Sequence, residues 1–256
     1  MKFSSKAIRR MGFIRDQSGI MNRYLRETRH WEPHLEKTRE FIRNSFTGQD
    51  YESVTVLGSG WLLDVPLDHL AGRFRKVTLV DIFHPPQIRK KVKDLDHVQL
   101  VETDLTGGAV EQIWQLSKKR GALNPDSLPE MLHLEPPLPR IRSGVVVSVN
   151  LLNQLDIHLC DFLRDRGWTE DEPMDRCREL IQSFHIDWIT ASPGCIITDA
   201  AEINRDRSGK ETIKPLLYTE LPLGIRRERW IWEFDTSATY RSGFRTRMEV
   251  RAVEWT

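Results

Sequence analysis

The sequence predicts an α/β fold built on a doubly wound, mostly parallel sheet, and three observations support this fold class. Short apolar runs alternate with helix-like segments through most of the chain, as strands and crossover helices do. Some runs, such as Val145 to Val147, are apolar at every position, which is typical of strands covered on both faces. The chain closes on two runs of alternating polarity, which favours an antiparallel pair at the sheet's edge.

A helical segment precedes the predicted sheet. With 256 residues the chain can hold one large domain or two small ones, and we expect residues 1–49 to form an N-terminal helical cap and residues 50–256 the α/β domain. Apolar positions in residues 1–47 follow the helical period, and Pro33 stands where a first helical turn tolerates it. Lys and Arg outnumber Asp and Glu here, which favours a solvated amphipathic face over an anion-binding or partner-binding surface.

The first half of the α/β domain is predicted to contain four strands. The apolar run that begins at residue 53 leads into the glycine turn Gly58-Ser59-Gly60, and a helix-like stretch runs from Leu62 to Ala71. The other three predicted strands cover residues 76–83, 97–104 and 143–150, with helical segments after Pro86 and over residues 108–119.

The second half is predicted to contain two loops, two helices and three strands. Residues 121–142 hold too many prolines for regular structure, and residues 204–223 form a second loop punctuated by glycine and proline. The remaining predictions are helices over residues 152–165 and 173–188, a fifth strand over residues 194–203, and a closing pair over residues 228–235 and 244–255.

Composition excludes several classes of protein. The 38 basic and 37 acidic side chains leave a formal net charge of +1, so the whole chain has no electrostatic preference for nucleic acid or an anionic membrane. No apolar run is long enough for a signal peptide or a membrane span. Cys160, Cys177 and Cys195 fit neither a disulfide framework nor a metal site. We therefore expect a cytoplasmic protein without a metal cofactor.

The glycine turn is the first candidate for ligand binding. Gly58, Ser59 and Gly60 follow a strand, where backbone N–H groups can face a ligand with no side chain in the way. The dinucleotide fingerprint would require a further glycine at the position of Leu63, so the sequence disfavours an NAD-linked oxidoreductase. A tight turn without a ligand is the alternative interpretation.

Two acidic residues at neighbouring strand ends add to this turn. Asp81 ends the second predicted strand about twenty residues after the turn, where a carboxylate can accept both hydroxyl groups of a ribose. Asp104 ends the third strand, where it could accept a hydrogen bond from an exocyclic amine such as that of adenine. Each acid alone is more typical of a helix cap or of the surface. Together they define one crevice for a nucleoside.

In this order of residues the chain resembles the class I S-adenosylmethionine-dependent methyltransferases over residues 50–256, with a degenerate first motif. The resemblance implies a seven-stranded sheet whose last strand is antiparallel, S-adenosylmethionine as the cofactor, and a methyltransferase acting on an unidentified acceptor. It implies that the cofactor-binding residues are Gly58, Ser59, Gly60, Asp81, Ile82, Asp104, Leu105 and Asn150. Asn150 is also the candidate catalytic residue, which would orient the acceptor rather than act as a base.

The first and fourth motifs depart from the family pattern. Val56 stands where the family has an acid, and Leu62 where it has a third glycine. The residues from Asn150 to Gln154 are not the Asn-Pro-Pro-Tyr type used on the amino groups of nucleobases. These departures support an alternative, a methyltransferase-like protein without catalysis that binds a nucleoside or a partner. Methyl transfer works largely by alignment, so a missing acid or base does not exclude activity.

Other side chains are given structural roles. We expect His84 to pack in a loop, and Asp156 and His158 to point to different faces of a helix. Asp199 and Glu202 are interpreted as ordinary strand-end acids rather than acceptor ligands. The arginines and acids of the closing strands favour ion pairs over a nucleic-acid surface, so a small-molecule acceptor is the preferred partner.

Overall fold

The structure, a computed structural model, describes residues 4–119, 127–141, 143–168 and 170–256. It contains one mixed sheet of eight strands, in which seven follow the order β3-β2-β1-β4-β5-β8-β7 and β6 pairs with β5 alone. The strands are β1 (Ser53–Leu57), β2 (Lys76–Asp81), β3 (Val98–Glu102), β4 (Gly144–Val149), β5 (Gly194–Arg205), β6 (Glu211–Pro215), β7 (Arg226–Asp235) and β8 (Arg245–Trp255).

Strand direction confirms the predicted fold class. Strands β1 to β5 are joined by parallel pairings, whereas β8 is antiparallel to both β5 and β7. The β1 and β4 pairs bury Val54, Val56, Val145 and Val147 completely, as expected for strands covered on both faces. The carboxyl ends of β1 to β5 therefore meet at one edge of the sheet, where open α/β sheets bind ligands.

Helices cover both faces of this sheet. They are α1 (Ser5–Arg10), α2 (Phe13–Asn44), α3 (Leu67–Arg73), α4 (Pro86–Val92), α5 (Ala109–Leu116), α6 (Leu128–Met131), α7 (Ile157–Arg164) and α8 (Asp171–Ile189). One apolar layer joins α2, α3 and α4 to the sheet, and a second layer joins α5, α7 and α8 to the opposite face. No helix within the described ranges is long and apolar enough to cross a membrane.

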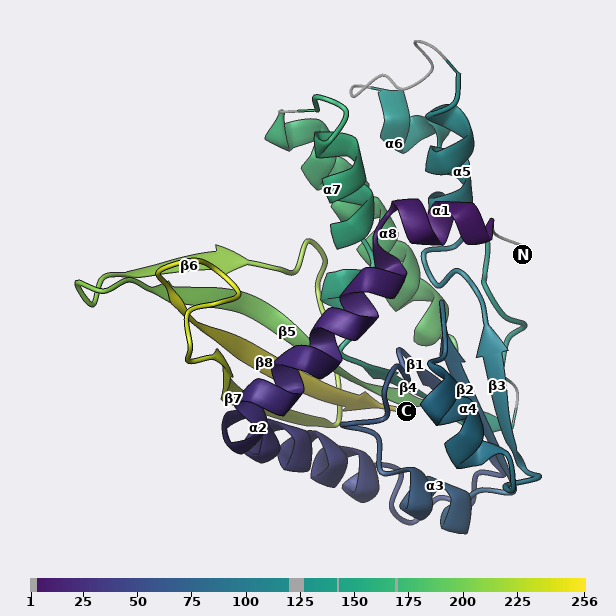
Figure 1. Ribbon diagram of the computed structural model, residues 1–256. Helices are drawn as coiled ribbons and strands as arrows, with labels where there is room; N and C mark the ends of the chain where they lie inside the picture. The colour runs from purple at the N-terminus through teal and green to yellow at the C-terminus, as the bar shows by residue number, and fades with distance from the viewer. Residues whose placement is uncertain (1–3, 120–126, 142, 169) are drawn as a thin grey trace.

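The N-terminal segment is helical, as predicted, and lies against the closing strands. Helix α2 packs on β7 (Figure 1). In this contact Trp31 meets Trp232 edge-on, with 4.8 Å between the ring centroids. Pro33 lies inside α2 rather than in a first turn, because the helix already begins at Phe13. The helix has a kink at Glu27, whose φ is −106° and ψ 17°. The buried Glu27 carboxylate accepts hydrogen bonds from Thr236 and Ser237. Whether residues 1–49 form a separate domain stays a prediction.

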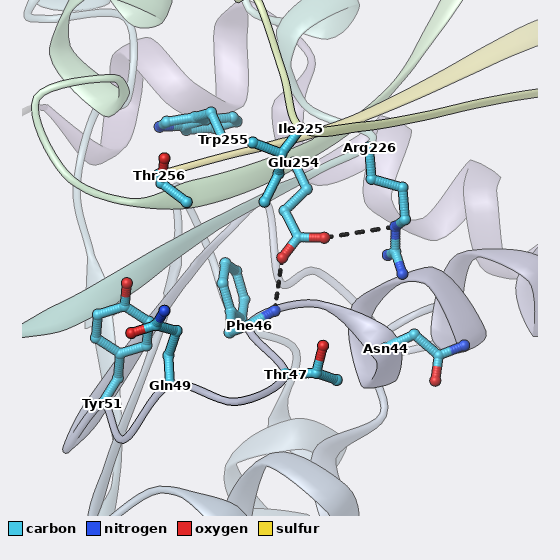
Figure 2. A pocket seen from close by; sticks show the side chains of 10 residues that line it. All are labelled: Asn44, Phe46, Thr47, Gln49, Tyr51, Ile225, Arg226, Glu254, Trp255 and Thr256. Atoms are coloured by element: carbon cyan, nitrogen blue, oxygen red, sulfur yellow. Dashed lines mark hydrogen bonds and ion pairs between the residues drawn. The ribbon is translucent and has the colours of Figure 1, made fainter.

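The C-terminal end of α2 is held by the sheet as well. Oε1 of Glu254 on β8 accepts the N–H of Phe46 at 2.7 Å, and its Oε2 lies 3.4 Å from Nε of Arg226 (Figure 2). Arg226 also donates to the carbonyl oxygen of Phe41 at 2.6 Å and lies over the Phe41 ring. These contacts fix the C-terminal end of α2 beside the end of β8, at the amino edge of the parallel strands.

Three predicted segments differ in the structure. The helix expected over residues 62–71 begins only at Leu67, since Leu62 has a φ of +55° and Val65 precedes a proline. The loop expected over residues 121–142 contains the short helix α6, which has Pro129 in its first turn; residues 120–126 and 142 lie outside the described residues. The helix expected over residues 152–165 is divided into a 3-10 turn (Leu152–Gln154) and α7.

The loop expected over residues 204–223 contains β6, a strand that the sequence did not predict. Strand β5 is longer than β4: its pairing with β4 ends at Ile197, and from Ala201 onward the same strand pairs antiparallel with β6. All five residues of β6 are exposed, so the strand has no buried apolar face for a sequence pattern to reveal. The sheet therefore extends beyond the parallel strands and forms a wall at their carboxyl edge.

Candidate functional site

A cavity of about 530 Å³ lies at the carboxyl edge of the parallel strands, between the sheet and α2. Every residue that the sequence selected for the site lines it: Gly58, Ser59, Gly60, Asp81, Ile82, Asp104, Leu105 and Asn150. A smaller cavity of about 170 Å³ lies beside Phe46 and Trp255, at the opposite edge of the sheet (Figure 2). The large cavity is the candidate functional site.

Glycine is required at the turn for two different reasons. At Gly58, φ is +78°, and a Cβ would lie 2.6 Å from the carbonyl oxygen of Val149, so the turn packs against the end of β4. At Gly60, φ is +41°, and a Cβ would stand 3.8 Å from both the Asp81 carboxylate and the Gln17 amide. Gly58 is thus required for packing and for its positive φ, whereas at Gly60 the positive φ favours glycine and a Cβ would make ordinary contacts.

Ser59 is held within the turn by His84. The hydroxyl of Ser59 lies 3.0 Å from Nε2 of His84, whose ring is completely buried. Burial lowers the pKa of His84 to about 4, so this ring is neutral at pH 7. His84 therefore packs in its loop, as expected, and holds the glycine turn through its hydrogen bond with Ser59.

Leu62, which stands where the sequence comparison expected a third glycine, has a left-handed backbone conformation. Leu62 has a φ of +55°, in the left-handed region that glycine adopts without strain. Its side chain is buried in the apolar layer under α2. The first motif therefore departs from the family pattern in residue type but retains the backbone conformation that glycine favours.

Asp81 is fixed by backbone donors. Its Oδ2 accepts the N–H of Gly60 at 2.8 Å, and its Oδ1 accepts the N–H of Ile82 at 2.7 Å and an amide hydrogen of Gln17 at 3.4 Å. Burial raises the pKa of Asp81 to about 6, against these hydrogen bonds. The carboxylate is oriented by the glycine turn and keeps lone pairs for a ligand.

Asp104 has a capping role in addition to its place in the cavity. Its Oδ1 accepts the N–H of Thr106 at 2.9 Å and the Thr106 hydroxyl at 2.5 Å, and its Oδ2 accepts the N–H of Val110 at 3.2 Å. Burial raises the pKa of Asp104. Leu105 beside it, like Ile82 beside Asp81, gives this part of the cavity an apolar surface.

Asn150 stands at the end of β4 in an unusual conformation. Its φ is +46°, and its backbone N–H donates to the carbonyl oxygen of Ile197 on β5 at 2.8 Å. Nδ2 donates to Asp64 Oδ2 at 2.5 Å. Within the described part of the chain the buried Oδ1 has no hydrogen-bond partner. Nδ2 also lies 3.4 Å from Nε2 of His34. The amide nitrogen thus lies between one acid and one histidine, and Oδ1 is an unused acceptor.

Several cavity residues were not selected from the sequence. Asp64 lies in the loop after the glycine turn, and burial raises its pKa. Gln17 and His34 come from α2, which crosses over the cavity; Gln17 also accepts, through its carbonyl oxygen, the indole N–H of Trp61 at 2.7 Å. No motif marks these residues, because their place depends on how α2 packs over the sheet.

Aromatic side chains of α2, β7 and the β7–β8 turn line the far end of the cavity. His34 stacks on Trp232 with ring centroids 3.9 Å apart, and Nδ1 of His34 accepts the indole N–H of Trp230 at 3.1 Å. Burial lowers the pKa of His34 to about 3, so this ring is neutral at pH 7. The guanidinium of Arg23 lies over Phe234 and Tyr240 at 4.7 and 4.8 Å.

Asp199 lies on β5 where the strand changes partner. The pairing of β5 with β8 shifts register between Asp199 and Ala201, a bulge of the kind that redirects side chains. Cys195 and Ile197, on the same face, belong to the layer under α2, so Asp199 also faces α2. The carboxylate is 3% exposed, and its Oδ2 accepts an amide hydrogen of Asn153 at 3.4 Å. Burial, with the charges of Asp64 and Glu202, raises its pKa to about 7.

Acidic groups outnumber basic ones around the cavity. The lining carboxylates are Asp16, Asp64, Asp81, Asp104, Asp161, Asp199 and Glu202, and the lining arginines are Arg15 and Arg23. Two histidines also line the cavity. The ring of His34 is neutral, and Nε2 of His158 lies 3.6 Å from the carboxylate of Asp16. The cavity is therefore suited to a ligand that carries positive charge.

The residues given structural roles behave largely as expected. Asp156 contacts Gln182 and Arg178, whereas His158 contacts Asp16 and Phe13, so the two side chains point apart. The closing strands contain ion pairs such as Arg226 with Glu254 and Arg251 with Glu249. Trp230 and Trp232 are buried against α2. Asp199 and Glu202 differ from expectation, because both line the cavity.

Comparison with known proteins gives only distant similarities. No family model matches the chain, and no curated protein sequence does. Among solved structures, the chain is similar to the 1,6-didemethyltoxoflavin-N1-methyltransferase of Burkholderia thailandensis with bound S-adenosylhomocysteine (10% identity, 100% of this chain and 93% of that chain, TM-score 0.45). It is also similar to the DhpI complex with SAH (13% identity, 93% of this chain and 95% of that chain, TM-score 0.37). A third similar structure is the 23S rRNA methyltransferase ErmE (12% identity, 86% of this chain and 67% of that chain, TM-score 0.32).

Proposed function

We propose that the protein is an S-adenosylmethionine-dependent methyltransferase that acts on a small-molecule acceptor. The observation that carries this proposal is the convergence of the eight motif residues on one cavity at the carboxyl edge of the sheet. These residues come from the ends of four strands. The sequence indicated the glycine turn, Asp81 and Asp104, and the resemblance to methyltransferases implied the full set. A cytoplasmic location stays a prediction.

The cavity fits the cofactor in charge and in hydrogen-bonding groups. The Asp81 carboxylate, the Gln17 amide and Gly60 all line the cavity. Oε1 of Gln17 and Oδ1 of Asn150 are buried acceptors without a partner in the described ranges. S-adenosylmethionine supplies donors for such groups, and its net positive charge suits a cavity lined mainly by acids.

Each motif residue then has a role in binding. Asp81 accepts the ribose hydroxyls, since the glycine turn fixes its two oxygens. Ile82 and Leu105 flank the adenine, and Asp104 accepts from its exocyclic amine. Gly58 and Gly60 let the chain pass the methionine part. Asn150 stands between this region and β5, where it orients the acceptor for in-line attack. When bound, the cofactor supplies an electrophilic methyl group on a positively charged sulfur.

Binding is tested by calorimetric titration of the purified protein with S-adenosylmethionine, S-adenosylhomocysteine and NAD. We expect the first two to bind and NAD not to bind. Asp81→Ala should weaken binding of S-adenosylhomocysteine by about 1 to 3 kcal/mol, because it removes a hydrogen-bonding carboxylate. Asp94→Ala, at an exposed acid between α4 and β3, is the matched control and should bind like the wild type.

The outcomes separate the alternatives. Binding of both sulfur ligands without turnover of any acceptor would favour a methyltransferase-like binding protein. Binding of NAD alone would favour an oxidoreductase. Unchanged affinity in Asp81→Ala would contradict its ribose-binding role, and no binding of either sulfur ligand would overturn the proposed function.

A further inference from the structure

Three polar side chains beyond the motif residues define a second region of the cavity. This acceptor region consists of Asp64, Asp199 and Glu202, with Asn150 at its border. The nucleoside-binding motif residues follow β1, β2 and β3, whereas Asp199 and Glu202 lie on β5, on the other side of β4. The region is therefore separate from the place assigned to the nucleoside, and the inference below rests on the proposed function.

Asp199 is the least satisfied acid of the region. It is almost completely buried, its only described hydrogen bond is the long one from Asn153, and its Oδ1 has no partner among the residues that the structure describes. No Lys, Arg or His of the described ranges lies within ion-pair distance of Asp199. A buried carboxylate in this state needs either a proton or a positively charged neighbour.

The neighbouring groups reinforce this need. Asp64 is likewise without a described ion-pair partner, and its negative charge raises the pKa of Asp199. Glu202 is 4% exposed; one of its oxygens accepts an amide hydrogen of Asn204 at 2.6 Å and lies 3.3 Å from Arg241. Among the described residues, Arg241 is thus the one basic side chain paired with the three carboxylates of the acceptor region. Arg23 is stacked on Phe234 and Tyr240 and forms no described ion pair with any of the three.

The unused acceptors specify the missing group further. Oδ1 of Asn150 and Oδ1 of Asp199 both lack a donor within the described part of the chain. The two residues belong to neighbouring strands, since Asn150 follows β4 and Asp199 lies within β5. A carboxylate ligand has no hydrogen to donate to them, and a hydroxyl group has one. A protonated amine has several N–H groups and a positive charge, so it can satisfy both oxygens and the excess of acids.

We propose that the methyl acceptor is an amine, bound through its nitrogen by Asp199 and Asn150 in the acceptor region. The amine enters as an ammonium ion and loses one proton to the Asp199 carboxylate. The freed lone pair of nitrogen forms a bond to the methyl carbon of the sulfonium donor, and the carbon–sulfur bond breaks with its electron pair going to sulfur. The donor becomes a neutral thioether, the amine is methylated, and Asp199 releases its proton to water.

Charge preference is tested with three probes of the same shape: 2-phenylethylamine, 2-phenylethanol and 3-phenylpropionate. Each is titrated into the protein saturated with S-adenosylhomocysteine. We expect the amine to bind about tenfold more tightly than the alcohol, and the carboxylate to bind least. Asp199→Asn should weaken binding of the amine about tenfold and leave binding of the alcohol unchanged. Asp187→Asn, at an exposed acid of α8, should keep the wild-type preference.

The same measurements distinguish failure of the amine proposal from failure of the proposed methyltransferase function. If Asp199 served only to balance the sulfonium charge, Asp199→Asn would weaken S-adenosylmethionine but not S-adenosylhomocysteine, and the amine preference would remain; this result would overturn the amine proposal. Equal binding of the three probes, or binding of none, would also overturn it while S-adenosylhomocysteine still binds. Failure of S-adenosylhomocysteine itself to bind would instead overturn the proposed function.

Discussion

Asp81 and Asp199 lie in the two halves of one cavity and are satisfied in opposite ways. Both are buried at the carboxyl edge of the sheet, and burial raises the pKa of each. Asp81 accepts two backbone N–H groups at 2.7 and 2.8 Å, whereas Asp199 has one described side-chain donor at 3.4 Å. The nucleoside half is thus built by the backbone of one strand and turn. The acceptor half is built by side chains of distant segments.

The largest expected effect tests the backbone-built half. Gly58→Ala places a Cβ 2.6 Å from the carbonyl oxygen of Val149 at a φ of +78°, and neither backbone can yield easily. We expect the free energy of unfolding to fall by about 3 kcal/mol or more, because strain and overpacking add. Urea denaturation measures it.

Gly72→Ala is the control for this substitution. Gly72 lies in α3, and a Cβ there meets nothing within 4 Å, so the variant should be as stable as the wild type or up to about 1 kcal/mol more stable. Equal stability of the two variants would mean that the turn yields, and that the nucleoside half is less rigid than its contacts indicate.

The second prediction concerns the pH dependence caused by Asp199. Its pKa is 3.8 in the unfolded chain and about 7 in the folded protein, so between these values the folded protein holds a proton that the unfolded chain has lost. Stability therefore falls as pH rises through this window. From pH 5 to pH 8 the wild type should lose about 2 to 3 kcal/mol relative to Asp199→Asn. Urea denaturation of both proteins at both pH values measures the difference.

Comparison of the two proteins cancels the other titrating groups. His34 and His185 are buried and have lowered pKa values of about 3, so each adds stability as pH rises, in wild type and variant alike. Asp187→Asn should reproduce the wild-type pH dependence. Parallel curves for the wild type and Asp199→Asn would show that Asp199 stays ionised in the folded protein and finds a positive partner.

The smallest expected effect tests whether α2 contributes to the nucleoside half. Gln17→Ala removes a 3.4 Å hydrogen bond to Asp81 and the unpartnered Oε1. We expect binding of S-adenosylhomocysteine to weaken by about 0.5 to 1 kcal/mol. Stability should change little, because the hydrogen bond from the Trp61 indole N–H to the Gln17 carbonyl oxygen remains. An unchanged affinity by calorimetry would limit the nucleoside half to the sheet.

The same contrast explains which features the sequence could predict. Asp81 and Asp104 stand at the ends of neighbouring apolar strands, and parallel strands bring their carboxyl ends to one edge, so chain order predicted their place in one cavity. Asn150 was predicted through the resemblance to methyltransferases. Asp64, Gln17 and His34 carry no such signal, because their positions depend on the packing of α2 and of a loop. Strand β6 escaped prediction for a related reason, since its residues are all exposed and its pairing follows from the length of β5.

Leu62 has a consequence for how the binding turn behaves before a ligand arrives. A glycine at this position would let the free turn sample many conformations, and binding would then have to select one of them. The buried leucine side chain instead ties the turn to the apolar layer in its left-handed conformation. The protein pays the cost of ordering this loop once, during folding, and the turn is already preorganised when the nucleoside enters.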